Sequence, residues 1–217
     1  NSIGKGSFSN SFIEEISIPK HVKIIGEEAF SRCYKLKKIE FIEDSELHTI
    51  EKFAFEDSSI ESISIPASVE DLQEGWCKGT SKLKNVIISS FNKHFKYLDS
   101  NQKIIIGKST SKEKEEFENI IFANRDIKDA KIPSFIKHIK SFSFYQCDRL
   151  KTINFSDDST LETIGKESFS YSSISHIKIP SNLRIISESS FLSCYNLNKV
   201  EFCKNSELQR IEKNAFS

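Results

Sequence analysis

The sequence lacks the features that mark several large protein classes. None of its 217 residues is Met, one is Trp and four are Pro. No run of about 18 apolar residues occurs, so nothing in it is predicted to span a bilayer as a helix. Neither sign of charge is in excess, because Lys plus Arg and Asp plus Glu both number 31. A neutral chain lacks the basic footprint of nucleic-acid-binding proteins, and we predict no nucleic-acid partner.

The few prolines are regularly placed and reveal an internal repeat. Each follows an Ile, and the spacings between them are 47, 67 and 47 residues for Pro19, Pro66, Pro133 and Pro180. The same spacings separate the ends of four related phrases: LKKIEF at Phe41, LKNVII at Ile88, LKTINF at Phe155 and LNKVEF at Phe202. The unit is therefore 47 residues, with 20 extra residues inserted once, between Ile88 and Pro133. Periods of this size indicate a repeat architecture.

Each unit divides into two similar halves of about 22 to 25 residues. Each half begins with an extended phrase such as IESISI, in which apolar and polar residues alternate as in a half-buried strand. A return phrase such as IIGEEAF follows, and Pro after the strand ends the ladder. We expect eight strands, beginning near Ile13, Leu36, Ile60, Leu83, Ile127, Leu150, Ile174 and Leu197.

The return phrases share an aromatic position. It is assigned to Phe8, Phe30, Phe55, Trp76, Phe144, Phe169, Phe191 and Phe216. Stacking of successive coils at roughly 4.8 Å should bring these rings into a continuous column, which we interpret as core rather than as a cofactor site.

The repeated wording resembles the BspA-like (Treponema pallidum-type) leucine-rich-repeat family, closest in style to trichomonad surface proteins. The phrases that carry the resemblance are IPKHVKIIGEEAFSRCYKL from 18, IPSFIKHIKSFSFYQCDRL from 132 and IPSNLRIISESSFLSCYNL from 179. The resemblance implies a leucine-rich-repeat solenoid with right-handed coils, a parallel β-sheet on the concave face, irregular or short-helical return segments and one β-hairpin insertion. It also implies a surface protein that binds host cells, matrix proteins or other microbes.

The expected organisation is a single array over residues 1–217, with eight or nine repeats and a degenerate repeat carrying the hairpin at 89–126. The chain starts with SIGKGSF and stops at KNAFS, both inside return phrases. We expect a fragment of a longer protein, whose apolar end faces stack on further coils or on a neighbour, with end-to-end or edge self-association possible. No signal peptide is visible in the sequence.

One short stretch, KIIIGKST at 103–110, resembles the end of a phosphate-binding loop. The full motif needs a first glycine so that backbone amides can surround the phosphates, and Gln102 stands at that position. The alternative is that FKYLD and KIIIG form a hairpin about a Ser-Asn-Gln turn. We prefer the hairpin and predict no cofactor.

The cysteines and histidines suggest structure rather than chemistry. Cys33, Cys147 and Cys194 share one repeat position. Cys147 and Cys194 lie two coils apart, and this distance of about 10 Å is too long for a disulfide. Cys77 is expected in the core, and Cys203 near the surface. The five histidines (His21, His48, His94, His138 and His176) show no metal-ligand spacing. No nucleophile motif occurs, so we predict neither a metal site nor catalytic residues.

The alternation also predicts which strand residues face outward, on the surface that repeat proteins use for partners. The predicted partner-binding set is Glu15, Ser17, Lys38, Glu40, Ser62, Ser64, Asn85, Ile87, Asp129, Lys131, Thr152, Asn154, His176, Lys178, Lys199 and Glu201. It is polar, mixed in sign and without aromatics, so a broad, weak, multivalent contact fits better than one tight pocket.

Our hypothesis is a non-enzymatic protein-binding and adhesion module, at the cell surface or secreted. The alternative is a cytoplasmic protein-interaction scaffold built from the same repeats. The insertion is a further candidate for recognition, because loops on rigid scaffolds often carry it.

Overall fold

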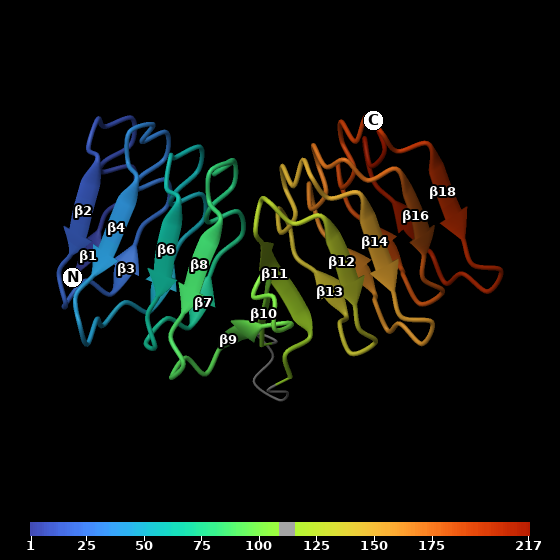
Figure 1. Ribbon diagram of the computed structural model, residues 1–217, viewed down its shortest axis with the longest axis horizontal. Helices are drawn as coiled ribbons and strands as arrows, with labels where there is room; N and C mark the ends of the chain where they lie inside the picture. The colour runs from blue at the N-terminus through green and yellow to red at the C-terminus, as the bar shows by residue number, and fades with distance from the viewer. Residues whose placement is uncertain (109–115) are drawn as a thin grey trace. The chain divides into compact units, whose positions relative to one another are not determined.

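The computed structural model describes residues 1–108 and 116–217 (Figure 1). The chain forms two compact units, Asn1–Lys96 and Tyr97–Ser217. Both are built from the same coil, which contains a four-residue strand, a two-residue strand and the turns that join them. The leucine-rich-repeat fold expected from the sequence is confirmed. The described return segments contain turns and short strands and no helix.

The first unit has two parallel sheets. The long-strand sheet has the order β2-β4-β6-β8, from Glu15–Ile18, Lys38–Phe41, Ser62–Ile65 and Asn85–Ile88. The short-strand sheet has the order β1-β3-β5-β7, from Ser2–Ile3, Ile24–Ile25, Thr49–Ile50 and Asp71–Leu72.

The second unit repeats this plan with interruptions. Its long strands form two pairs, β12-β14 and β16-β18, from Asp129–Ile132, Thr152–Phe155, His176–Ile179 and Lys199–Phe202. Its short strands belong to a sheet of order β19-β17-β15-β13-β11-β10-β9. Their bounds are His138–Ile139 for β13, Thr163–Ile164 for β15, Ile185–Ile186 for β17 and Arg210–Ile211 for β19.

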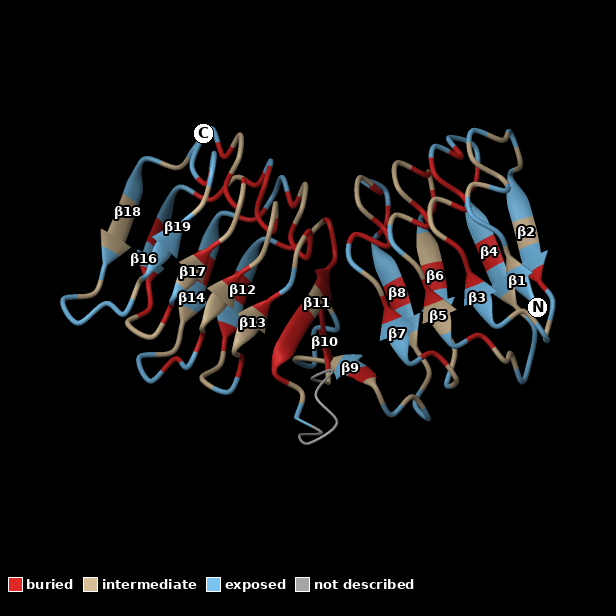
Figure 2. Cartoon of the chain, turned by 180° about the vertical axis from the view of Figure 1, so that it is seen from behind, coloured by how far each residue is buried: buried red, intermediate tan, exposed pale blue. Residues whose placement is uncertain are grey.

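The eight long strands are those expected from the alternation, but each begins two residues later than predicted. In β6 the first predicted residue, Ile60, is buried just before the strand, and pairing starts at Ser62. Ile63 and Ile65 then point into the core while Ser64 is exposed. Strands β12 and β16 alternate fully between exposed and buried residues, and Figure 2 colours the long strands by burial.

The insertion contains the predicted hairpin. Its strands are β9 (Phe95–Tyr97) and β10 (Ile104–Gly107), which are neighbours in the sheet. The backbone N–H of Leu98 donates to the carbonyl of Ile104 at 2.8 Å. A third strand, β11 (Asn119–Ala123), was missed by the sequence analysis. It pairs antiparallel with β10 and parallel with β13, and so it joins the hairpin to the coils.

Seven of the described return turns place two residues, four apart, in the left-handed region. In the second coil these are Glu28 (φ 55°) and Arg32 (φ 57°), and in the fourth they are Gly75 (φ 66°) and Gly79 (φ 73°). The bend repeats in register, so N–H groups donate to the next coil: that of Arg32 reaches the carbonyl of Glu56 at 2.7 Å. The turns thus form a hydrogen-bonded ladder of their own.

The aromatic column is present in both units. In the first unit, Phe8 stacks on Phe30 with ring centroids 5.1 Å apart, and Phe30 stacks on Phe55 at 5.4 Å. In the second unit, four rings stack at 4.9, 5.1 and 5.1 Å: Phe144, Phe169, Phe191 and Phe216. The largest fully buried side chains include most of these phenylalanines, so the column is core, as predicted.

The assignment of Trp76 to this column is wrong. The backbone N–H of each column residue donates to the carbonyl of the residue before the next one, and Phe55 donates to Trp76 at 2.8 Å. Cys77 therefore occupies the aromatic position. Trp76 fills the preceding position, which holds Ala in the coil of Phe55, and its ring meets Phe55 edge-on at 6.3 Å. The spacing agrees, because Leu72 pairs with Ile50, and Cys77 follows Leu72 by the same five residues that separate Phe55 from Ile50.

Candidate functional site

The predicted outward-facing residues lie on the outer face of the long strands. Of the sixteen, Ser62 and Glu201 are half-buried and the other fourteen are exposed. In the first unit they form one surface over the β2-β4-β6-β8 sheet, and in the second they lie over the two strand pairs. The face is therefore open to solvent along the long strands.

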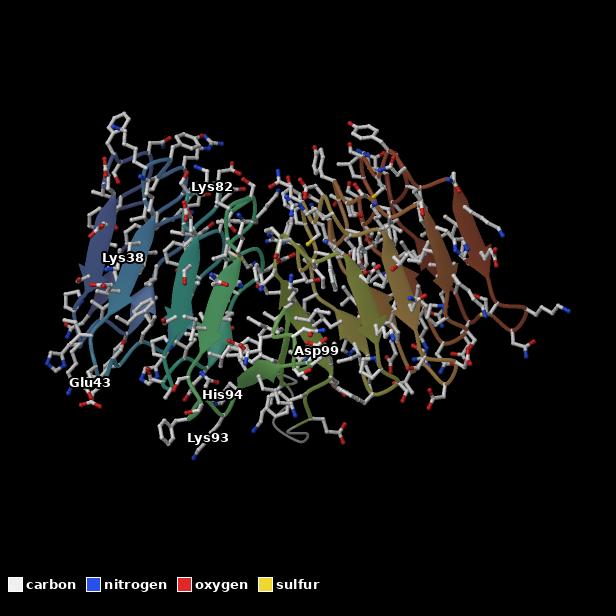
Figure 3. All side chains as sticks on the ribbon, in the orientation of Figure 1. Lys38, Glu43, Lys82, Lys93, His94 and Asp99 are labelled. Carbon is white, nitrogen blue, oxygen red and sulfur yellow. The ribbon has the colours of Figure 1, made fainter. Side chains whose placement is uncertain are left out.

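Polar side chains on this face contact one another both within a strand and between neighbouring strands. In the first unit, Lys38 Nζ lies 2.5 Å from Glu40 Oε1, and Ser17 Oγ lies 3.4 Å from Glu40 Oε2 (Figure 3 labels Lys38). The hydrogen bond from Lys38 lowers the pKa of the Glu40 carboxyl, and the carboxylate raises the pKa of Lys38. Because both groups are exposed, this pair contributes little to the stability of the fold.

The second unit has a comparable network. Thr152 Oγ1 donates to Asp129 Oδ1 at 2.5 Å. Glu201 accepts from Lys199 and lies 3.3 Å from Nε2 of His176. The hydrogen bond from Lys199 and the charge of Lys199 lower the pKa of Glu201. The face therefore presents paired charges of both signs in each unit.

The backbone pairing between adjacent long strands is incomplete at one junction in each unit. Strands such as β2 and β4, whose equivalent residues Ser17 and Glu40 are 23 residues apart, pair over four residues. One more residue separates β4 from β6, and there only Lys38 and Ser62 pair. The junction between β14 and β16 has the same extra residue, and these two strands belong to different sheets. At both junctions the extra residue accompanies a loss of pairing between the strands.

A surface hollow lies at each of these two junctions. On the face of the first unit a hollow of ≈ 680 Å³ is lined by the strands around this junction, including Glu40, Phe41 and Ser62. In the second unit a hollow of ≈ 270 Å³ lies between β14 and β16, with Asn154, His176 and Lys178 in its walls. The sequence signal for both positions is the spacing between equivalent strand residues, which is 24 at these junctions and 23 within the strand pairs.

The sequence analysis also missed an exposed apolar cluster next to the first hollow. Ile42 is 50% exposed, Ile87 54% and Phe91 81%. Only Ile87 is in the predicted set. Ile42 and Phe91 lie in the turns after β4 and β8, outside the alternating phrases. The signal was their apolar character at positions where turns are ordinarily polar.

The stretch that resembled a phosphate-binding loop lies in a hairpin. Gly107 is the last residue of β10 and pairs with Asn119, whose Nδ2 donates to the carbonyl of Lys108 at 3.0 Å. Ser109 lies outside the described residues. Gln102, at the position of the missing glycine, has a φ of 56° and forms the hairpin turn.

The five cysteines are all free, with Cys203 half-buried and the others buried. The shared position has one role in both units: Sγ of Cys33 donates to the carbonyl of Phe8, and Sγ of Cys194 donates to that of Phe169, each at 3.1 Å. Burial raises the pKa of the Cys147 thiol to about 11. The histidines lie apart, and within residues 1–108 and 116–217 no group of three metal-ligating side chains gathers.

The model of the BspA type leucine rich repeat region matches residues 1–112 and 115–217. The crystal structure of the pneumococcal vaccine antigen PcpA is similar at 25% identity, with a TM-score of 0.77. The match covers 97% of this chain and 54% of that one, so the chain spans about half the antigen structure.

Two further structures share the fold. A leucine rich cell surface protein from Faecalibacterium prausnitzii has 17% identity and a TM-score of 0.69, over 95% of this chain and 66% of that one. A leucine-rich repeat protein from Bacteroides ovatus has 20% identity and a TM-score of 0.53, over 98% and 60%. None of the curated proteins matches the chain in sequence. Among the described residues there is no helix with the length and apolar character needed to cross a membrane.

Proposed function

Because the chain belongs to the BspA-type leucine-rich-repeat family, we propose that it is a non-enzymatic protein-binding module of a cell-surface or secreted protein. It uses the outer face of its long strands to adhere to proteins of host cells, the matrix or neighbouring cells. The insertion hairpin is a second recognition element of the same module.

The observation that carries this proposal is the row of exposed polar side chains on each unit. Lys131, Asn154 and Lys178 are exposed on successive strands of the second unit, and Lys38 and Glu40 stand in the first. Hydrogen-bonded strand pairs hold side chains such as Lys131 and Asn154 at fixed spacing, so the ordering cost of binding is small. The face has no Trp, Tyr or Arg, the residues that most often dominate tight interfaces. Many weak contacts made at once fit it better.

The relatives support a surface location. The pneumococcal protein is a vaccine antigen, and the Faecalibacterium protein of the same fold is described as a cell surface protein. The exposed lysines of the sheet face also provide a direct test of location.

The test is labelling of intact cells that express the parent protein, with a membrane-impermeant amine-reactive biotin. Peptides containing Lys131, Lys178 or Lys199 should carry biotin while a cytosolic marker protein does not. Labelling only after lysis would contradict the surface role.

The second candidate is an intracellular interaction scaffold. The five free thiols favour it, because disulfides are rare in reducing compartments. The same labelling experiment separates the two, since a scaffold inside the cell is labelled only after lysis.

A further inference from the structure

An apolar groove in the first unit lies beyond the ends of β4, β6 and β8. It is a hollow of ≈ 500 Å³, within the size range of ligand pockets. Its apolar lining comes from the strand ends and the turns that follow: Phe41, Ile42, Ile65, Pro66, Ala67, Ile87 and Phe91. The last of these is the most exposed, at 81%. Clusters of exposed apolar side chains with a polar rim mark sites of interaction.

The rim of this groove is acidic. The charged residues that line it are Glu43 and Asp44, which stand at one side on the turn after β4 (Figure 3 labels Glu43). Asp44 has a distant ion pair with Lys20, at 3.8 Å, and its own side chain is 80% exposed. Serine hydroxyls complete the lining, at Ser45, Ser64 and Ser89. A ligand that covers the apolar floor therefore meets negative charge beside it.

The groove adjoins the hollow on the sheet face. Phe41, Ile42 and Ser64 line both. A chain lying along this path would pass from the opened β4–β6 junction to the apolar end without leaving the first unit. This continuity suits an extended ligand better than a compact one.

The second unit supplies an internal comparison. Residues 114 positions later occupy the same places in its coils, as Pro66 and Pro180 show. Phe41 and the acidic turn have counterparts in Phe155, Asp157 and Asp158, but the other exposed apolar residues do not. Ser156 replaces Ile42, Ser181 replaces Ala67, Glu201 replaces Ile87 and Asn205 replaces Phe91. The fold therefore does not require the apolar groove of the first unit.

We propose that this groove binds an extended segment of a partner protein in which an apolar side chain is followed closely by Lys or Arg. The apolar side chain fills the space between Ile42, Ile87 and Phe91, and the cation faces Glu43 and Asp44. The inference goes beyond the adhesion function, because the groove can bind such a segment whatever the compartment of the parent protein.

The test is selection of peptides from a displayed library of short random linear sequences on the immobilised chain. The comparison protein carries Ile42→Ser, Ile87→Glu and Phe91→Asn, which are the residues of the second unit at the same places. These residues already stand in a folded coil, so the variant should keep the circular dichroism spectrum and thermal midpoint of the parent. Enriched peptides should contain an apolar residue followed by Lys or Arg, and should bind the variant about tenfold more weakly or worse.

A second variant, Glu43→Lys with Asp44→Lys, isolates the charge. It should weaken the same peptides, and added salt should weaken the parent complex. Enrichment of acidic peptides, no enrichment, or equal binding to the triple variant would each overturn the proposal. A concentration-dependent dimer in sedimentation, abolished by the triple variant, would overturn it in favour of a second copy of this chain. The adhesion function is tested independently, by the biotin labelling of intact cells.

Discussion

The two units solve the same packing problem with the same interior and differ on their surfaces. Phe30 and Phe169 are fully buried, and each stacks on rings of adjacent coils. On the surface, Ile87 and Glu201 occupy equivalent places and have opposite character. The interior is set by the coil, because each ring must lie over the next, whereas outward positions are free to differ. Differences between equivalent exposed residues of the two units therefore indicate function better than the overall composition of the surface does.

Each unit has one coil in which a small residue replaces the stacked ring of the column. In the first unit the fourth column position holds Cys77, and in the second the first holds Ala123, whose N–H donates to the carbonyl of Ser143 at 2.8 Å. In both coils an aromatic residue, Trp76 or Phe122, stands one position earlier and is buried. A small residue in the column thus accompanies a ring beside it in both units.

The largest expected effect comes from removing one ring from a column. Phe30→Ala and Phe169→Ala should each lower the free energy of unfolding by about 3–5 kcal/mol, because each leaves a cavity between stacked rings. Urea denaturation followed by circular dichroism measures both. Trp76 is the only Trp, so its fluorescence reports on the first unit. Phe30→Ala should move the fluorescence midpoint to lower urea.

The urea midpoint of Trp76 fluorescence in the Phe169→Ala variant then tests how independently the two units unfold. The exposed Phe91→Ala is the control and should change stability little, because its ring is already in water. A fluorescence midpoint that Phe30→Ala leaves unchanged would contradict the column as the core of the first unit.

The next prediction compares the reactivity of the thiols at the shared repeat position, such as Cys147 and Cys194, with that of Cys203 outside it. With its pKa raised to about 11 by burial, Cys147 has about a hundredfold less thiolate at neutral pH than a thiol of the ordinary pKa of 9.0. Burial also raises the pKa of Cys194. In the native protein a chromogenic disulfide reagent should react quickly with the half-buried Cys203 and slowly with the other four.

Cys203→Ser should abolish the fast phase, and denaturant should expose all the remaining thiols. A fast phase that survives this substitution would show that a coil thiol is accessible, contrary to its burial.

Much of the fold was predictable because the alternation of apolar and polar residues, and its regular repetition, determine which side chains are buried. The eight long strands and the outward orientation of residues such as Lys38 and Thr152 follow from side chains pointing alternately to the two faces of a strand. Strand β11 was missed because NIIFA lies after a charged segment, and its pairing with β10 depends on residues distant in sequence. Local patterns cannot reveal a partner of that kind.

The candidate site was predictable only in part, for a related reason. Strand residues such as Asn85 follow the alternation, but Ile42 and Phe91 lie in turns, where no period says which way a side chain points. The left-handed residues were also hidden. Glu28 and Ser189 have φ values of 55° and 56°, a conformation that composition associates with Gly. The inter-coil ladder imposes that conformation on side chains that would not favour it.

A smaller effect tests the position of Trp76. Cys77→Phe alone should destabilise the first unit by about 1–3 kcal/mol, because the new ring meets Trp76 in a packed core. Trp76→Ala with Cys77→Phe restores the Ala-Phe pair that stands at Ala54 and Phe55, and should be more stable than Trp76→Ala alone. Urea denaturation by circular dichroism measures each variant. If Cys77→Phe were neutral and the double variant no better than Trp76→Ala, Cys77 would not be in the column.

The smallest effect compares the turns of the two units. Gly75 and Ser189 occupy equivalent places and share the left-handed conformation, with φ values of 66° and 56°. A left-handed residue with a side chain costs roughly 1–2 kcal/mol, and the greater freedom of Gly in the unfolded chain offsets part of this. Ser189→Gly should therefore stabilise the second unit by less than about 1 kcal/mol, or raise the thermal midpoint by about 2–4 °C or less.

The reverse exchange, Gly75→Ser, should lower the midpoint, and differential scanning calorimetry can measure both. Ser175→Gly is the matched control, because Ser175 is outside the left-handed region and Gly there only adds freedom to the unfolded chain. It should destabilise. If Ser189→Gly destabilised the protein as much as Ser175→Gly, the turn would carry no strain at Ser189. The two units would then be equivalent at this place despite their different residues.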